Sequence, residues 1–230
     1  MKQITPSLSL LPLGFVNAYL LEDHEGLTLI DTGMPGGADK IVTALEKAGK
    51  DPQKIKRILL THAHTDHAGS AAALASRWSV PVWAHAEEAS LLARGLPGEK
   101  PLITSPGLMN HLIAAMVAGK ARSHIEPVET ARKLEDGEVL PIAGGLRVLL
   151  TPGHSPGHLA FLLVKEKVLV AGDICAHMNG LSWSMGYEDR AQGLRSILKA
   201  AEEDFDTAVF GHGGPLRAQA NQRLKARFTR

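Results

Sequence analysis

The nine residues from Thr61 to Gly69 constrain this chain more than any other stretch. Their sequence is Thr-His-Ala-His-Thr-Asp-His-Ala-Gly, so three imidazoles and one carboxylate fall within six consecutive positions. The apolar end of residues 56–60 predicts a buried strand before the stretch, and the alanine-rich residues 69–75 predict a helix after it. The histidines therefore lie on a predicted loop that leads from a strand into a helix.

The spacing within this loop favours two metal ions over one. His62 and His64 are two residues apart, so in extended backbone they point to the same side. Asp66 and His67 are adjacent, and we expect their side chains to diverge toward a second ion. The alternative is a polar turn whose histidines are solvated, with Asp66 stabilising the first turn of the helix electrostatically. Four possible ligands in six positions favour the metal site.

Composition indicates a globular chain without a polyanionic partner. The chain has 230 residues, of which 44% are hydrophobic and 21% charged, as is usual for one large domain or two small ones. The formal net charge is +1 and both signs are mixed along the sequence, which argues against nucleic-acid binding and an anionic membrane surface. The basic stretch from Arg217 to Arg230 is interpreted as the solvated face of a terminal helix.

The single cysteine and the absence of long apolar runs favour a reducing compartment and a protein that does not span a membrane. Cys175 has no partner for an internal disulfide, fits a reducing compartment and is expected to be a small buried residue. No stretch has the pattern of a secretory signal or the length of a membrane span. The sequence therefore predicts a soluble, cytoplasmic protein.

The order of predicted elements indicates an α/β fold. Helical spacing and β-type runs alternate along much of the chain, and no linker divides it, so we predict a single domain over residues 1–230. Strands are predicted at residues 16–21, 27–30, 56–60, 80–85, 146–150, 159–164, 168–171 and 205–210, and helices at residues 37–49, 69–75, 86–94, 189–203 and 215–228.

Residues 86–125 interrupt this alternation. Within them, residues 108–118 are apolar but too short to span a membrane. Core packing is the default interpretation of the leucines and methionines. The alternatives are that residues 102–120 wall a substrate pocket, with Met109, Leu112 and Met116 facing it, or form a contact between subunits of a homodimer.

Three later loops each present a possible ligand where a predicted strand ends. His154 and His158 follow the strand at 146–150, Asp173 follows the strand that begins at Val168, and His212 follows the last strand. Each has a plain alternative, since a histidine can cap a turn, an aspartate can begin a helix, and glycines surround His212. Their occurrence in order at strand ends favours a shared metal site.

The stretch at 62–67 resembles the His-x-His-x-Asp-His signature of the metallo-β-lactamase superfamily, and the later order of His, Asp and His continues the resemblance over residues 16–215. The resemblance implies a four-layer αββα sandwich with two mixed β-sheets and the site at a loop edge. It also implies two divalent metal ions, zinc first, with iron or manganese as alternatives. One ion would be bound by His62, His64 and His154 and the other by Asp66, His67 and His212, while Asp173 would bridge the two.

The same resemblance implies that other polar residues lie near the metal ligands and support them. The superfamily has an aspartate at the position of Asp31 that supports the site, and His158 belongs to the Thr-Pro-Gly-His pattern without being a ligand. Lactonases of the superfamily often use a tyrosine near the bridging aspartate, which makes Tyr187 a candidate with packing as the alternative. His85 ends a predicted strand near the site, and it is left outside the ligand set.

The ligand pattern also separates the branches of the superfamily. The members that cleave β-lactams, after which the superfamily is named, have a cysteine where this chain has Asp173. The flavodiiron members have a glutamate where this chain has His64. The pattern resembles glyoxalase II and lactonases, which implies that a metal-bridging hydroxide, oriented by the catalytic residues Asp66 and Asp173, attacks a carbonyl. We expect a small-molecule ester or lactone, because little sequence follows His212 for the glutathione-recognition extension of glyoxalase II.

Three other functions remain as alternatives to ester or lactone hydrolysis. They are a glyoxalase II-like thioesterase, a mononuclear iron persulfide dioxygenase, and a non-catalytic protein that binds metal or senses a ligand. The last is disfavoured because a structural zinc needs four closed ligands, whereas this chain offers seven in an open pattern.

Overall fold

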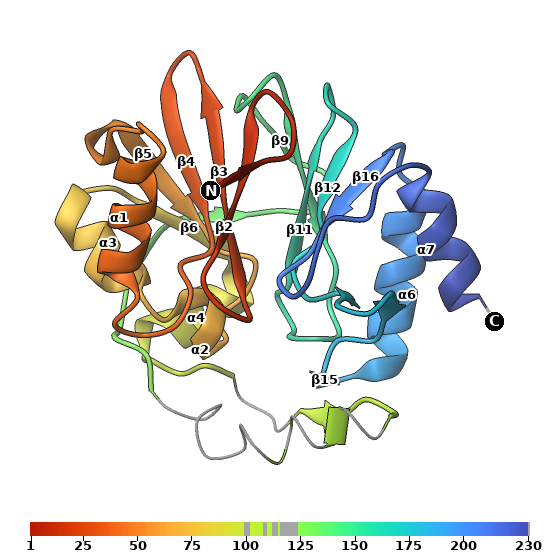
Figure 1. Cartoon of the computed structure of the whole chain (residues 1–230). Coiled ribbons are helices and arrows are strands. Elements are labelled where there is room, and N and C mark those ends of the chain that lie inside the picture. The colour runs from red at the N-terminus through yellow and green to blue at the C-terminus, as the bar shows by residue number, and fades with distance from the viewer. Residues whose placement is uncertain (99–101, 108–109, 112–114, 116–123, 230) are drawn as a thin grey trace. The chain divides into compact units, whose positions relative to one another are not determined.

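The computed structural model describes residues 1–98, 102–107, 110–111, 115 and 124–229. The chain divides into two compact units, one comprising Met1–Glu99 with Ala121–Leu134 and the other Lys100–Lys120 with Glu135–Arg230 (Figure 1). Each unit has its own mixed β-sheet and its own cluster of buried apolar side chains. The α/β fold class predicted from the sequence is therefore confirmed.

The first unit is built on a seven-stranded sheet in the order β1-β2-β3-β4-β5-β6-β8. Strands β1 to β4 pair antiparallel, whereas β4, β5, β6 and β8 pair parallel. The strands are β1 Lys2–Gln3, β2 Leu8–Pro12, β3 Asn17–Asp23, β4 Gly26–Ile30, β5 Ile55–Leu59, β6 Val82–His85 and β8 Thr130–Leu134. Because parallel strands end at the same edge, the loops that follow β4, β5 and β6 meet there.

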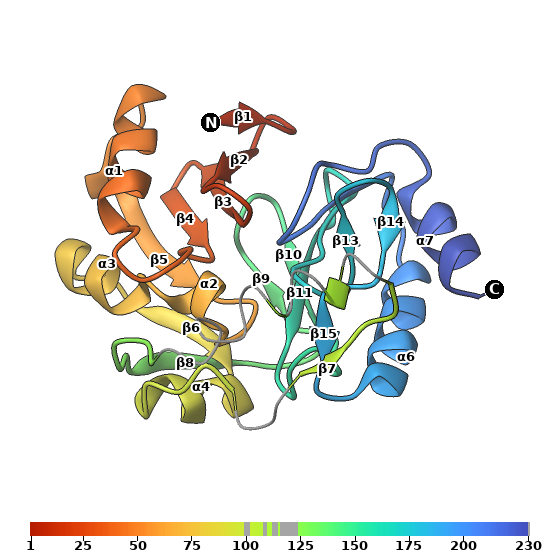
Figure 2. The same ribbon diagram turned by 60° about the horizontal axis from the view of Figure 1, so that its bottom comes forward.

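Helices cover one face of this sheet, on the same side in both views (Figures 1 and 2). Ile41 and Leu45 of the first helix and Leu74 of the third are fully buried, and they pack with Leu29 and Ile58 of the sheet. This is the apolar stripe that a helix presents to a sheet. The helices are α1 Ala38–Lys47, α2 Thr65–Ala68, α3 Ala71–Trp78 and α4 Ala86–Ala93, with a 3-10 turn at Pro52–Lys54.

The second unit is built on a five-stranded sheet in the order β16-β12-β11-β10-β9, with two small sheets that pair β13 with β14 and β15 with β7. Only β12 and β16 pair parallel within the larger sheet. Its strands are β7 Ile103–Thr104, β9 Val139–Leu140, β10 Leu146–Leu150, β11 Leu159–Leu163, β12 Val168–Val170, β13 Ala176–His177, β14 Leu181–Ser182, β15 Gly186–Tyr187 and β16 Thr207–Val209. Its helices α6 Arg190–Ala201 and α7 Ala220–Phe228 bury apolar residues in one cluster with this sheet.

Strands at both edges of the first sheet were missed from the sequence. No strand was predicted at residues 2–12 or 130–134, yet β1, β2 and β8 form there. Strand β8 has the sequence Thr-Ala-Arg-Lys-Leu, of which only Leu134 is buried, because it pairs with β6 at the edge of the sheet. Charged residues are common on edge strands, where they discourage pairing with other chains, and they conceal the β pattern.

The terminal helix begins later than predicted. It was expected to start at residue 215, but Leu216 exchanges two backbone hydrogen bonds with Ala208 and so extends the sheet instead. Ala218 and Gln219 then adopt positive φ angles of 60° and 53°, which separate this bridge from the first turn of α7.

The apolar residues 108–118 fall mostly outside the described part of the chain. Met109, Leu112 and Met116, which were expected to face a substrate pocket, are among the residues that the structure does not describe. Within the described ranges, no helix is both long enough and apolar enough to cross a bilayer.

Gly69 allows a close backbone approach in the first unit, and its replacement is the first test. A Cβ atom there would lie 2.3 Å from the ring nitrogen of Pro35 and 2.3 Å from the carbonyl oxygen of Thr65. We expect Gly69→Ala to destabilise the protein by about 1–3 kcal/mol, because backbone atoms must shift. Gly214→Ala is the control, since nothing lies within 4 Å of its Cβ position. Equal melting midpoints for both variants would contradict the account.

Candidate metal centre

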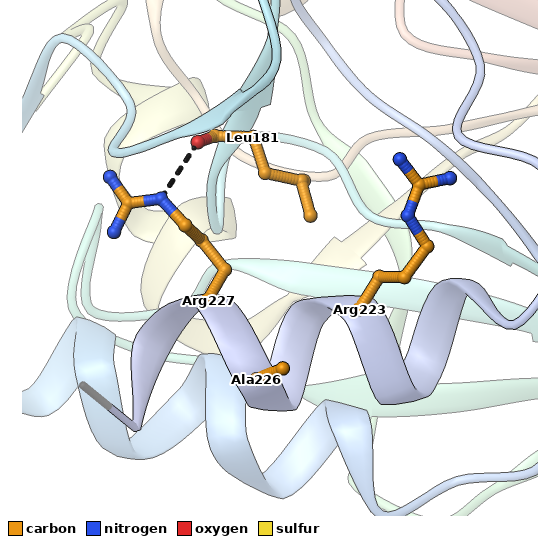
Figure 3. Close-up of a pocket in the computed structure, with 4 residues that line it drawn as sticks. All are labelled: Leu181, Arg223, Ala226 and Arg227. Atoms are coloured by element: carbon orange, nitrogen blue, oxygen red, sulfur yellow. Dashed lines mark hydrogen bonds between the residues drawn. The ribbon is translucent and has the colours of Figure 1, made fainter.

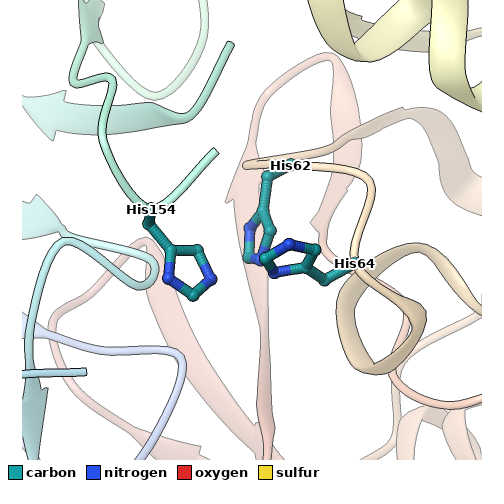
Figure 4. A group of neighbouring side chains, drawn as sticks. All are labelled: His62, His64 and His154. Carbon is teal, nitrogen blue, oxygen red and sulfur yellow. The ribbon is translucent and has the colours of Figure 1, made fainter. Parts of the chain in front are cut away.

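The histidine-rich stretch leads from the end of β5 into the short helix α2, as the sequence predicted. His62 and His64 precede the helix, and their ring centroids lie 4.5 Å apart with ligand nitrogens within 4.8 Å. Figure 4 shows these two imidazoles on the loop after β5, and it also labels His154 of the second unit. The two side chains therefore point to the same side, as expected from their spacing.

The expectation that Asp66 and His67 diverge is wrong. Asp66 Oδ2 lies 3.8 Å from His67 Nε2, and the His67 ring lies 4.2 Å from the His62 ring, centroid to centroid. The reason is that Asp66 and His67 belong to the helix α2 and not to extended backbone. Successive side chains of an α-helix are rotated by about 100° around the helix axis, whereas those of a strand point to opposite faces. The first unit thus gathers three imidazoles and one carboxylate.

The carboxylate of Asp31 organises this group from the end of β4. It accepts hydrogen bonds from the Thr61 amide at 2.8 Å, from the Thr61 hydroxyl at 2.8 Å and from His67 Nδ1 at 2.9 Å. Asp31 is 2% exposed and has a φ of 60°, a conformation that aspartate adopts more readily than most residues. The supporting position predicted for Asp31 agrees with these contacts.

The same network assigns the tautomers of two histidines. The Thr61 hydroxyl donates to Asp31, so it accepts from Nδ1 of His62, which lies 2.9 Å away. Nδ1 of His67 likewise donates to the Asp31 carboxylate. Both rings therefore carry their proton on Nδ1, which makes Nε2 the nitrogen suited to bind a metal.

Glu88 is a further buried group that sequence reasoning missed. Its side chain lies on α4 with no exposed surface, and its carboxylate accepts a hydrogen bond of 2.8 Å from the amide of Ala63, between His62 and His64. In the sequence it is one of two consecutive glutamates on an ordinary helix, and Glu87 beside it is exposed. No sequence signal separated the two.

The second unit gathers His154, Asp173 and His212 from loops after β10, β12 and β16. Asp173 Oδ2 lies 3.6 Å from His154 Nε2 and 3.3 Å from His212 Nε2. Nδ1 of His154 donates to the Gly186 carbonyl at 2.7 Å, so Nε2 is again the nitrogen suited to bind a metal. Asp173 and His154 are buried, whereas the His212 side chain is 17% exposed.

His158 supports Asp173 and is not itself suited to bind a metal. Its Nε2 accepts a hydrogen bond of 2.9 Å from the Asp173 amide, so its proton is on Nδ1, which donates to the Thr151 hydroxyl at 2.8 Å. Both ring nitrogens are therefore engaged. The supporting position predicted for His158 agrees with these contacts.

His85 and Tyr187 have structural contacts of other kinds. Nδ1 of His85 accepts from the Glu87 amide at 3.3 Å and caps α4, consistent with its exclusion from the ligand set. Tyr187 is fully buried and not on the surface, and its hydroxyl donates to the Ile174 carbonyl at 2.7 Å. Burial raises the pKa of the Tyr187 phenol well above its usual value, which argues against proton transfer by this group.

Cys175 is buried as expected, and it belongs to none of the groups of candidate ligands found among the described residues. Burial is the main cause that raises the pKa of its thiol, so the free side chain is a thiol and not a thiolate nucleophile.

A surface hollow on the second unit is distinct from these ligands. Leu181, Arg223, Ala226 and Arg227 line it, and the two guanidinium groups lie on α7 on either side of Leu181 (Figure 3). Arg227 Nε donates to the Leu181 carbonyl at 3.0 Å, and Arg223 donates to the Arg217 carbonyl at 3.0 Å. Arg223 and Arg227 thus lie on a terminal helix as the sequence predicted, whereas Arg217 precedes α7 and Arg230 lies outside the described residues.

The chemistry of the donors fits divalent transition metals. Each unit offers imidazole Nε2 atoms beside carboxylate oxygens, a combination that suits zinc and also iron or manganese. The hydrogen bonds to Nδ1 are the outer contacts that orient histidine ligands in metal sites. The assignment of the seven ligands to particular ions remains a prediction.

Asp31→Asn tests the organisation of the first unit. Asparagine also tolerates a positive φ, but its amide has one oxygen in place of two, so the donors on Thr61 and His67 cannot all be satisfied. We expect zinc affinity, measured by competition with a chromophoric chelator, to fall about 10–100-fold. Asp39→Asn is the control, because that side chain is 86% exposed and pairs only with Arg77 among the salt bridges described. Unchanged affinity in Asp31→Asn would contradict this account of the site.

Comparison with known proteins places most of the chain in one family. The sequence model of the metallo-beta-lactamase superfamily matches residues 11–212. Hydroxyacylglutathione hydrolase GloC of Haemophilus influenzae is 28% identical over 85% of this chain and 84% of its own length. N-acyl homoserine lactonase AiiA of Bacillus thuringiensis subsp. kurstaki is 28% identical over 84% of this chain and 79% of its own length.

A solved structure agrees with the sequence comparisons. A metallo-beta-lactamase family protein from Thermus thermophilus matches with a TM-score of 0.73 and 31% identity, over 99% of this chain and 81% of that protein. The family match covers elements of both units, including all seven predicted ligands. The chain therefore belongs to the metallo-beta-lactamase superfamily and has its fold.

Proposed function

We propose that this protein is a metal-dependent hydrolase of small esters or lactones. In this proposal, His62, His64 and His154 bind one divalent ion, and Asp66, His67 and His212 bind a second. Asp173 bridges the two ions, which are zinc in the first instance, with iron or manganese as alternatives. The substrate is a small molecule.

The position of Asp173 is the observation that carries the proposal. One carboxylate oxygen, Oδ2, lies 3.6 Å from a nitrogen of His154 and 3.3 Å from a nitrogen of His212. These histidines belong to different predicted ligand sets. An oxygen that lies beside one histidine of each ligand set is in the position that a ligand shared by two metal ions requires.

The named relatives support hydrolysis at a carbonyl. GloC is named for hydrolysis of an acylglutathione and AiiA for hydrolysis of a lactone, and the family match runs through both ligand-bearing units of this chain. Both reactions add water to an acyl carbon and release an alcohol or a thiol. That shared step is what we transfer to this protein.

The chemistry divides between the bound metals and the protein. Divalent ions held by these residues would lower the pKa of bound water toward neutrality and would polarise the carbonyl of the substrate. The carboxylates of Asp66 and Asp173 orient the attacking water and accept its proton. In His62, His67 and His154 the group beside Nδ1 is an acceptor, so Nδ1 carries a proton and Nε2 is the nitrogen left to bind a metal ion.

A thioester is the second candidate substrate, and the relationship to GloC favours it. The two candidates differ only in the atom that leaves, oxygen or sulfur. A matched oxoester and thioester with the same acyl group therefore separate them.

The two-metal arrangement predicts a definite stoichiometry. Reconstituted protein should contain two zinc ions per chain by elemental analysis, and His67→Ala and His212→Ala should each contain fewer. His24→Ala is the matched control, because this histidine is exposed in the turn between β3 and β4. If the first two variants retain the metal content of the wild type, the second ion has been assigned wrongly.

Turnover tests the reaction itself. We expect the zinc or manganese form to hydrolyse a lactone or small ester. Asp173→Ala should abolish turnover while its circular dichroism spectrum shows that the fold is preserved, since the residue acts on metal and water. The same protein loaded anaerobically with ferrous iron is given persulfide and oxygen. Oxygen consumption in the iron form alone, with no carbonyl substrate cleaved by any metal form, would replace the hydrolase proposal with a dioxygenase.

A further inference from the structure

The segment that contains Ser184, Gly186 and Tyr187 contacts two candidate ligands of the second unit. We propose that Ser184 is a positioning residue, which turns the carboxylate of Asp173 toward the metal ions, and that Tyr187 anchors Ser184 in place. This inference rests on the proposed function and assigns a part to Ser184, which has no evident signal in the sequence.

The contact that carries the proposal is a buried hydrogen bond. The Ser184 hydroxyl donates to Asp173 Oδ2 at 3.1 Å, and the two residues are 1% and 3% exposed. Oδ2 is also the oxygen that lies beside His154 and His212. The hydroxyl therefore acts on the rotation of the carboxylate, whereas His158 contacts the Asp173 backbone amide.

The hydroxyl of Tyr187 links the backbone at Ser184 to the backbone beside Asp173. The hydroxyl accepts from the Ser184 amide at 3.1 Å and donates to the carbonyl of Ile174, the residue after Asp173, at 2.7 Å. A Cβ atom at Gly193 would lie 2.6 Å from the tyrosine ring, so α6 packs directly against it. Tyr187 thus fixes the distance between the backbone of Ser184 and that of the ligand loop.

The same segment also orients His154. The Gly186 carbonyl accepts from Nδ1 of His154, and the Tyr187 ring meets the His154 ring edge to face at a centroid distance of 5.8 Å. One short stretch therefore sets the orientation of a histidine ligand and of the bridging carboxylate. Preorganised ligands bind metal more tightly because less rotational freedom is lost on binding.

Removal of the hydroxyl should weaken metal binding without unfolding the protein. We expect Ser184→Ala to bind zinc about 10–100-fold more weakly in chelator competition, the usual effect of removing an outer hydrogen bond to a ligand. Its cobalt(II)-substituted form should show an altered visible absorption spectrum, because the geometry at the metal changes. A merely structural serine would change the melting midpoint and leave that spectrum intact.

Two further variants complete the experiment. Tyr187→Phe keeps the ring but removes both hydroxyl contacts, so its zinc affinity and cobalt spectrum should shift in the same direction as those of Ser184→Ala. Ser196→Ala is the matched control, because that buried hydroxyl donates at 2.6 Å to the backbone carbonyl of Pro152. Its zinc affinity and spectrum should equal those of the wild type.

The outcomes separate this inference from the proposed function. If wild-type protein binds zinc but Ser184→Ala has the same affinity and the same cobalt spectrum, the positioning proposal is wrong and the metal site stands. Should Ser184→Ala fail to fold, a wild-type spectrum and affinity in Tyr187→Phe would overturn the proposal. If wild-type protein binds neither zinc nor cobalt, the proposed function itself fails.

Discussion

The hydrogen bonds to Nδ1 of the histidines are the interactions on which the rest of this site depends. An imidazole binds metal productively only when its ring is oriented and its proton sits on the other nitrogen. In the first unit, the buried carboxylate of Asp31 does this for His67 directly and for His62 through the hydroxyl of Thr61. In the second unit, the carbonyl of Gly186 does it for His154.

The sheets explain why these side chains come together. In the first unit, parallel pairing of β4, β5 and β6 brings Asp31 and the histidine stretch to one edge. In the second, the parallel pair β12 and β16 ends in the loops that carry Asp173 and His212, while β10 ends before His154. Buried strands therefore fix the backbone from which each ligand projects, and loops supply the side chains.

The sequence pointed to the candidate ligands and to the supporting residues Asp31 and His158, but not to the other residues around them. Histidine and aspartate at strand ends are recognisable because their residue types are rare together and suited to metals, and strand alternation locates the loops. Thr61, Glu88 and Ser184 are common residues in ordinary contexts. Only three-dimensional placement shows that Thr61 and Ser184 contact candidate ligands and that Glu88 contacts the backbone amide between His62 and His64. Helical geometry at Asp66 was missed because a four-residue helix leaves no periodic pattern.

A crystal structure of the zinc-loaded protein, with anomalous diffraction recorded at the zinc absorption edge, tests the central claim most directly. The account predicts two anomalous peaks per chain, with Asp173 Oδ2 bound to both ions and His154 and His212 bound to different ones. A single peak, or two peaks with Asp173 bound to neither, would contradict it.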